Sequence, residues 1–221
     1  MQSLYAEAVV RWEPDAYGRL RQAALDLFTE QGFEDTTVAQ IAERAGLNRR
    51  TFFHHFADKR EVVFSGSKEV EELIVTQIRA QPASVDPLHA AAAGLRAAAD
   101  TVFEQQRETA AKRGRIVAAS PELQERETLK RATLAAAIAA ALRDRGTADQ
   151  AAVVAAWSAV AVFYVALARW TEAADPRPLA QLIDEILEEF LSAAACPVPN
   201  SAGIAPVQRP PDRSSRRSAR R

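Results

Sequence analysis

Residues 37–59 have the sequence TVAQIAERAGLNRRTFFHHFADK. Thr37, with Gln40 three residues later, matches the capping box, in which each side chain bonds a backbone group at the start of a helix. Gly46 follows the apolar pattern of that helix and can take the positive φ of a helix end. Asn48 is a good N-cap for a second helix. The stretch therefore predicts two short helices joined by a tight turn, a helix-turn-helix.

The second helix begins with two arginines, Arg49 and Arg50. The N-terminal residues of a recognition helix read base edges in the major groove, and arginine can bond guanine bidentately. From Arg44 to Arg60 there are five Lys or Arg and one acid, although the whole chain has a formal charge of −1. We therefore expect double-stranded DNA as the partner. The alternative is a plain helical corner with solvated arginines, but caps, spacing and charge agree better with DNA binding.

The segment also resembles the DNA-binding region of the TetR family of bacterial transcription regulators. That pattern is T-x-x-x-I-A-x-x-A-G-L, then a polar and two variable residues, then T-F-Y-x-H-F-x-x-K. It is matched here by Thr37, Ile41, Ala42, Ala45, Gly46, Leu47, Asn48, Thr51, Phe52, Phe53, His55, Phe56 and Lys59.

The resemblance implies phosphate contacts for Thr37, Thr51, His55 and Lys59, and base contacts for Arg49, Arg50 and His54. Phe53 stands where the family usually has tyrosine, so one phosphate-binding hydroxyl is missing, although the ring can still pack against sugar. The complete predicted DNA-binding set is Thr37, Asn48, Arg49, Arg50, Thr51, Phe53, His54, His55 and Lys59. We expect Phe52 and Phe56 in the core instead, because they lie four residues apart on one helical face.

The remainder of the chain predicts an all-α fold of about nine helices: an N-terminal three-helix helix-turn-helix domain and a larger C-terminal helical domain. We expect an arm over 1–14, a DNA-binding domain over 15–60, a ligand-binding and dimerisation domain over 61–196 and a disordered basic tail over 197–221. Caps and apolar periodicity place the later helices at 58–80, 86–107, 108–119, 121–144, 148–173 and 176–194.

Residues 151–168 carry no charge and satisfy the crude length test for a membrane span. The many alanines favour a helix packed on several sides, so we predict no membrane segment. A helix that is apolar all round needs a second covering surface, which we expect to be another subunit, as the family resemblance also implies. The predicted homodimer interface is Trp157, Val160, Leu182, Ile183, Ile186 and Phe190.

Large side chains among alanines in the C-terminal domain could enclose a small molecule. The predicted effector pocket is Phe103, Ile116, Leu134, Trp157, Phe163 and Tyr164. An ordinary core explains any one of these residues better than a ligand wall does, and no polar pattern defines the chemistry of the effector.

Several kinds of site are not predicted. The sequence has no serine-histidine-acid pattern, glycine-rich phosphate loop or dinucleotide fingerprint, so we expect neither an enzyme nor a cofactor. His54 and His55 are neighbours that point about 100° apart on a helix, so we expect no metal site. The single Cys196 fits a reducing cytoplasm, and residues 1–11 lack an export leader. The six arginines of the tail predict salt-sensitive, non-specific attraction to DNA.

These expectations combine into a dimeric transcription regulator, a repressor that leaves a palindromic operator when a small molecule binds. The helix beginning at Asp58 is the expected lever between the two domains. An activator or a ligand-independent regulator stays open as an alternative. So does a helical small-molecule-binding protein or enzyme with a vestigial DNA-binding unit.

Overall fold

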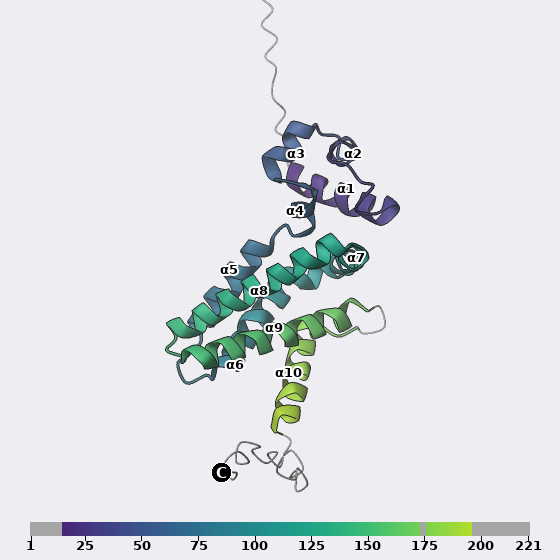
Figure 1. Cartoon of the computed structure of the whole chain (residues 1–221). Coiled ribbons are helices and arrows are strands. Elements are labelled where there is room, and N and C mark those ends of the chain that lie inside the picture. The colour runs from purple at the N-terminus through teal and green to yellow at the C-terminus, as the bar shows by residue number, and fades with distance from the viewer. Residues whose placement is uncertain (1–14, 173–175, 196–221) are drawn as a thin grey trace, which may run out of the picture.

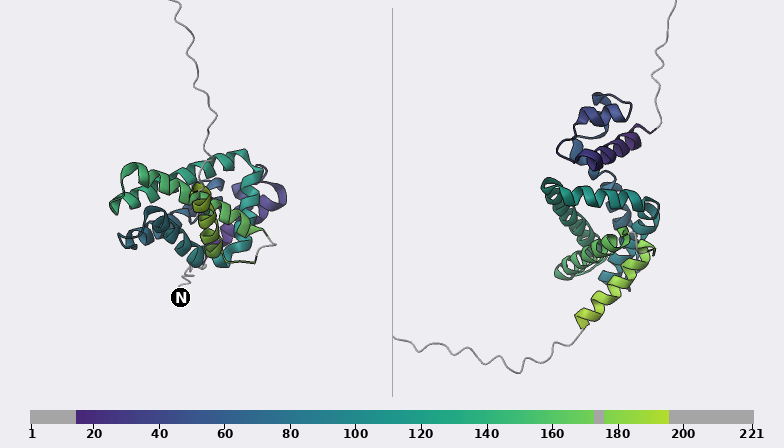
Figure 2. Two further views of the ribbon diagram at one scale, coloured as in Figure 1. Left: turned by 90° about the horizontal axis from the view of Figure 1, so that it is seen from below. Right: turned by 90° about the vertical axis from the view of Figure 1, so that its right-hand side faces the viewer.

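The computed structural model describes residues 15–172 and 176–195, and every element within them is helical. This confirms the all-α prediction. The predicted N-terminal arm, the basic tail and Cys196 lie outside the described residues. Figure 1 shows the N-terminal helices at one end of the molecule and α10 at the other, and the side view in Figure 2 agrees.

The N-terminal domain consists of α1 (Ala16–Gln31), α2 (Val38–Arg44), α3 (Arg49–His55) and α4 (Lys59–Val63). Each of these helices begins with a side chain that accepts a backbone N–H. The predicted capping box of Thr37 and Gln40 is present in both directions, and Asn48 accepts from the amide of Thr51. These bonds fix where the very short helices α2, α3 and α4 start, because the backbone N–H groups of a first helical turn have no acceptor within the helix.

The C-terminal domain continues through α5 (Ser67–Ala80), α6 (Pro87–Ala98), a π-helical turn η1 (Ala99–Phe103), a 3₁₀ turn η2 (Glu104–Gln106), α7 (Arg107–Ala119), α8 (Pro121–Asp144), α9 (Asp149–Thr171) and α10 (Leu179–Ala195). The single helix predicted over 58–80 is wrong, because α4 and α5 are separate helices. Gly66 between them has φ +82°, a conformation that ends a right-handed helix.

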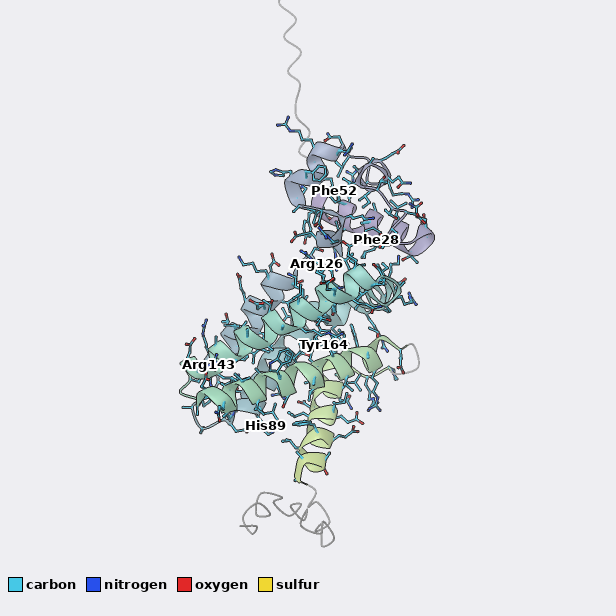
Figure 3. All side chains as sticks on the ribbon, viewed as in Figure 1. Phe28, Phe52, His89, Arg126, Arg143 and Tyr164 are labelled. Atoms are coloured by element: carbon cyan, nitrogen blue, oxygen red, sulfur yellow. The ribbon has the colours of Figure 1, made fainter. Side chains whose placement is uncertain are left out.

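Buried side chains form two cores. The N-terminal core contains the apolar faces of α1 to α4, including Phe28 and Phe52, which Figure 3 labels. It also contains Ile116, Val117 and Leu123, so the end of α7 and the start of α8 pack beneath the N-terminal domain. The C-terminal core joins α5, α6, α8, α9 and α10.

Helix α9 lies at the centre of the C-terminal core. Its length and apolar composition would allow it to cross a membrane, but a buried core helix meets the same test. Here α9 packs against α6, α8 and α10, and alanines such as Ala152, Ala156 and Ala166 are fully covered. Small residues let these helices approach closely, as predicted from the alanine content.

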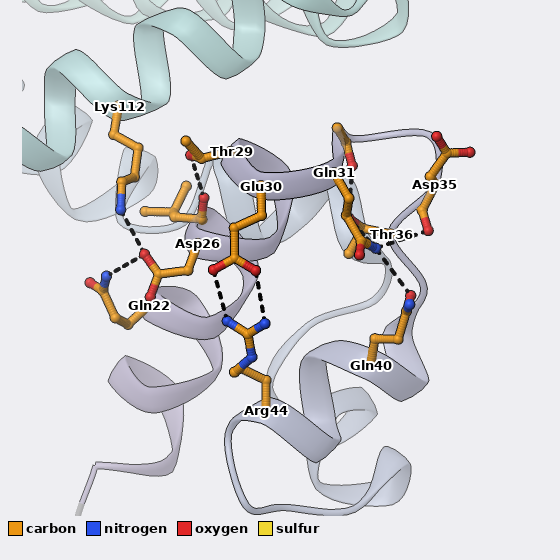
Figure 4. A network of polar contacts seen from close by, with 12 residues as sticks. Gln22, Asp26, Thr29, Glu30, Gln31, Asp35, Thr36, Gln40, Arg44 and Lys112 are labelled. Carbon is orange, nitrogen blue, oxygen red and sulfur yellow. Dashed lines mark hydrogen bonds and ion pairs between the residues drawn. The ribbon is translucent and has the colours of Figure 1, made fainter.

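Polar contacts also join the two domains. The Lys112 ammonium lies 2.6 Å from the Asp26 carboxylate, and Figure 4 shows this bond crossing from α7 to α1. Arg60 of α4 pairs with Glu122 of α8 at 2.9 Å. The N-terminal domain is thus held on α7 and α8 through both apolar packing and ion pairs.

Candidate nucleic-acid interface

Helix α3 has one buried face and one exposed face. Phe52 and Phe56 are buried, as predicted, and their ring centres are 5.5 Å apart. Arg49, Arg50 and His54 are exposed. The covered rings fix the orientation of the helix on α1, and the exposed side chains project from the opposite side, where a duplex could approach.

Arg49 and Arg50 differ from the other cations of this segment. Within residues 15–172 and 176–195, neither guanidinium group has a protein partner at hydrogen-bonding or ion-pair distance. Asn48 fixes the start of their helix by accepting the Thr51 amide at 2.9 Å. The first turn of α3 therefore presents two guanidinium groups that are available to an external partner.

The remaining three cations between residues 44 and 60 serve the fold. Arg44 forms two bonds of 3.0 and 2.8 Å to Glu30, which attach α2 to α1 (Figure 4). That bonding raises the pKa of Arg44 and lowers the pKa of Glu30. Arg60 bonds Asp58 at 2.6 Å. Of the five cations between residues 44 and 60, Arg49 and Arg50 are therefore the two whose charge is not used within the fold.

Lys59 is also occupied inside the protein. Its ammonium donates to the carbonyl oxygens of Phe33, Glu34 and Thr36 at 2.7, 3.1 and 3.1 Å. It also lies 4.3 Å from the centre of the Phe33 ring. An ammonium has three N–H donors, so these three carbonyls use them all. In this structure Lys59 closes the loop between α1 and α2, and its phosphate contact stays a prediction.

The other predicted contact residues lie on α3 or at the start of α2. Phe53 is 51% exposed, so its ring is accessible as expected for a sugar contact. Thr51 and His55 are partly exposed on the same helix. Thr37 lies at the start of α2, where its hydroxyl also donates to Gln40 at 2.9 Å. These positions are compatible with DNA contacts, which stay predictions.

Two supporting residues were missed from the sequence. The Tyr17 ring stacks on Phe56 at 5.0 Å and meets His55 edge-on at 6.2 Å, so it supports the end of α3 from α1. Arg19 donates to the carbonyl of Ala45 and so caps the end of α2. Neither contact could be found from local spacing, because each joins residues at least 26 positions apart.

The predicted dimer interface needs correction. Val160, Leu182, Ile183 and Ile186 are at most 8% exposed, because they belong to the C-terminal core of a single chain. Trp157 and Phe190 are 50% and 39% exposed. Only these two of the six predicted residues are open to another subunit. Other exposed apolar side chains on α9 are Val153, Val154 and Val165.

The predicted pocket residues are not gathered around one cavity. Ile116 lies in the N-terminal core and Trp157 lies on the surface, so their assignment to an enclosed pocket is wrong. Phe103, Phe163 and Tyr164 do meet, with ring centres 5.6 Å apart in each successive pair. Leu134 packs against the same core. Phe163 itself is 4% exposed.

An open hollow of about 710 Å³ lies beside this cluster, on α8 and α9. Its walls are Arg131, Ala161, Tyr164, Val165, Ala168, Arg169 and Glu172. The Arg131 guanidinium lies 3.8 Å from the centre of the Tyr164 ring. Tyr164 is thus the one predicted pocket residue that borders this hollow. Among the described residues, no three His, Cys, Asp or Glu side chains are grouped to hold a metal ion.

Comparisons with known proteins agree with this architecture. Residues 20–65 match the family model described as bacterial regulatory proteins of the tetR family, and residues 85–194 match the MftR C-terminal domain. The chain is 39% identical over 90 residues to the transcriptional regulator TcmR of Streptomyces glaucescens, covering 41% of this chain and 40% of TcmR. It is 31% identical over 108 residues to the putative mycofactocin biosynthesis regulator MftR of Mycobacterium tuberculosis, covering 48% and 52%. The matches thus span about half or less of these curated relatives.

Solved structures share the fold along most of the chain. One is the Thermus thermophilus repressor FadR in complex with lauroyl-CoA, with TM-score 0.54, 20% identity and coverage of 85% of this chain and 99% of FadR. Another is the triclosan complex of SmeT, a repressor from Stenotrophomonas maltophilia, with TM-score 0.57, 20% identity and coverage of 80% and 90%.

Both family models together cover the helix-turn-helix and most of the C-terminal helices, in the order that the structure shows. The sequence pattern of residues 37–59, the exposed face of α3 and these matches point to one family. The chain belongs to the TetR family of bacterial regulatory proteins.

Proposed function

We propose that this chain is a transcription regulator that binds double-stranded DNA through α3 and acts in the cytoplasm. The observation that carries the proposal is the first turn of α3, where Arg49 and Arg50 are exposed and without a protein partner in the described residues. The names of the relatives support the same role, since TcmR is a transcriptional regulator and KstR2 of M. tuberculosis is a transcriptional repressor.

The proposed regulator is a homodimer that reads a palindromic site. Exposed apolar side chains on α9 and α10, chiefly Val154, Trp157, Val165 and Phe190, supply a surface for a second copy. A two-fold dimer places two recognition helices about one helical turn of DNA apart. Sedimentation of Trp157→Asp against Leu129→Asp, an exposed leucine on α8, tests this surface. Dimers that survive Trp157→Asp would exclude it.

The proposed mechanism is repression that a small molecule relieves. FadR and SmeT, which share the fold, were each solved with a small molecule bound, and this supports a ligand site in the present chain. We place that site in the C-terminal domain. A ligand changes DNA affinity only if it binds one arrangement of the two domains better than the other. The hollow beside Tyr164 is the candidate place for such a ligand.

Selection of bound sequences from random duplexes tests the DNA-binding proposal. We expect a palindrome with half-sites one helical turn apart. Arg49→Ala and Arg50→Ala should each reduce discrimination between the selected site and a scrambled duplex by about 1–3 kcal/mol. The matched control is Arg115→Ala, which removes an exposed arginine of α7. Equal weak binding to all duplexes by the unmodified chain would refute the proposal.

A further inference from the structure

Glu127 of α8 is a buried carboxylate, with 5% of the residue exposed. Arg113 of α7 forms a close ion pair with it, and the Arg131 Nε lies 3.9 Å away. A charge in such a position needs partners, because burial removes its hydration. Glu127 therefore ties α7 to α8 inside the C-terminal domain.

Arg113 also reaches the hinge, which we define as residues 63–66, from the last residue of α4 to the residue before α5. Its Nε donates to the carbonyl oxygen of Val63 at 3.0 Å, and its guanidinium lies 5.0 Å from the centre of the Phe64 ring. Phe64 is 4% exposed and ends α4. One planar guanidinium thus binds Glu127 and the last turn of the N-terminal domain at the same time.

Tyr164 of α9 is linked to Glu127 through Arg131. Its ring lies 3.8 Å from the Arg131 guanidinium, whose Nε is 3.9 Å from the Glu127 carboxylate, and the charge of that carboxylate acts on the Tyr164 hydroxyl. Burial, with the negative charge of Glu127, raises the pKa of Tyr164 to about 12, so the hydroxyl keeps its proton. Tyr164 and Arg131 also form part of the wall of the hollow. Figure 3 shows Tyr164 between α8 and α9.

These contacts form a continuous chain from the hollow to the hinge: Tyr164 and Arg131, then Glu127, then Arg113, then Val63 and Phe64. We propose that Glu127 and Arg113 are positioning residues that couple the hollow to the orientation of the N-terminal domain. A change at Tyr164 or Arg131 alters the contacts between Glu127 and Arg113. Arg113 then changes its own contacts with Val63 and Phe64 in the hinge. The inference rests on the proposed function for its consequence at DNA, but the coupling is a property of the free protein.

The connection is polar and specific, so it differs from the apolar packing around it. Phe103 provides the comparison, because it touches Phe163 on the same side of the C-terminal core, with ring centres 5.6 Å apart, and takes no part in the polar contacts of Glu127. If these residues only stabilise the fold, Phe103 and Tyr164 substitutions should affect the hinge equally. If they couple the two sites, only Tyr164 should act on it.

Amide hydrogen exchange of residues 62–67 in the full chain, without DNA, tests the coupling. We expect Tyr164→Phe to speed exchange there at least about fivefold, the lower range of ordinary coupling between sites. Phe103→Leu should leave it within about twofold, after correction for global stability. In a Glu127→Gln background, Tyr164→Phe should add nothing, because residues that act through one group are not additive. The proposal would be overturned if hinge amides in Tyr164→Phe exchanged at the wild-type rate, or if the effects of Tyr164→Phe and Glu127→Gln on that rate were additive.

Arg113→Lys gives a second route if Glu127→Gln does not fold. Lysine keeps a charge beside Glu127 but lacks the planar fork that also bonds Val63 and covers Phe64. We expect faster hinge exchange in Arg113→Lys and no further effect of Tyr164→Phe. A full Tyr164→Phe effect in that background would contradict the role of Arg113. Because no DNA is present, these results are independent of whether the chain prefers any DNA sequence.

Discussion

Among the described residues, the N-terminal core is built around five buried phenylalanines, whereas the C-terminal core contains thirteen buried alanines and a single buried phenylalanine. A domain of about 50 residues has little interior, so each large ring must cover several helices at once. The longer C-terminal helices instead approach closely over many small side chains. The difference shows that stability is concentrated in a few residues near α3 and spread over many around α9.

The helix ends differ in the same way. Asp15, Thr37, Asn48 and Asp58 each cap a helix of the N-terminal domain with a side chain. Burial alone would raise the pKa of Asp58, but bonds from Arg60 and the Glu61 amide outweigh it and lower that pKa. In the C-terminal domain Asp86 caps α6, but among the described residues no side-chain cap bond precedes α5, α7, α8 or α9. The three shortest α-helices, α2 to α4, all have caps, whereas the two longest, α8 and α9, have none and depend on packing.

Phe52→Ala should have the largest effect on this comparison. Phe52 is 0% exposed and touches the rings of Phe53 and Phe56. Its loss should lower the free energy of unfolding by about 3–5 kcal/mol. The control is Phe53→Ala, the same change at a residue that is 51% exposed, and its effect should stay within about 0.5 kcal/mol. Denaturant unfolding measures both, and equal losses would contradict a concentrated core.

Tyr164 should make the C-terminal domain sensitive to alkaline pH. Its pKa is raised to about 12 by burial and the charge of Glu127, so the folded chain holds the proton more tightly than the unfolded chain. The resulting stability is fully present below about pH 10 and is lost as pH rises toward 12, a loss of about 2 kcal/mol. Unfolding of the wild type and Tyr164→Phe should therefore converge over this range. Parallel pH curves would refute the shift.

Ala156→Leu tests the close approach of helices around α9. Ala156 is 0% exposed, so added methyl groups have no space, and we expect a loss of about 1–3 kcal/mol. Ala151→Leu makes the same change at an exposed position of the same helix and should leave the unfolding free energy nearly unchanged. A loss from Ala156→Leu no greater than that from the control would show that the alanine core has room to spare.

Substitutions at helix caps should have the smallest effects on stability. Removing a cap in the N-terminal domain should destabilise the chain, whereas adding one in the C-terminal domain should stabilise it. Asn48→Ala should cost about 1 kcal/mol, whereas Asn48→Ser keeps an acceptor and should cost little. Ala148, at the start of α9, has φ −57° and ψ 144° and no side-chain cap. Ala148→Ser should therefore stabilise by up to about 1 kcal/mol. Thermal unfolding checks all three, and destabilisation by Ala148→Ser would show that packing already fixes this helix end.

Local chemistry allowed the helix-turn-helix to be predicted from the sequence. A cap acts within three or four residues, so Thr37 and Asn48 predicted the starts of α2 and α3. The spacing of Phe52 and Phe56 predicted which face of α3 is buried. Gly66, which can take a positive φ, also indicates the break between α4 and α5, but the prediction of one helix over 58–80 did not use it.

The sequence by itself determined where the short helices begin, which face of α3 is buried and which two arginines lead it. Only the tertiary structure decided that Lys59 bonds three carbonyls, that Ile116 belongs to the N-terminal core and that Leu182 and Ile183 are buried in the core of their own chain. The physical reason is range. An apolar stripe shows that a face will be covered but not by what, and a cation finds its partner only when distant segments have packed.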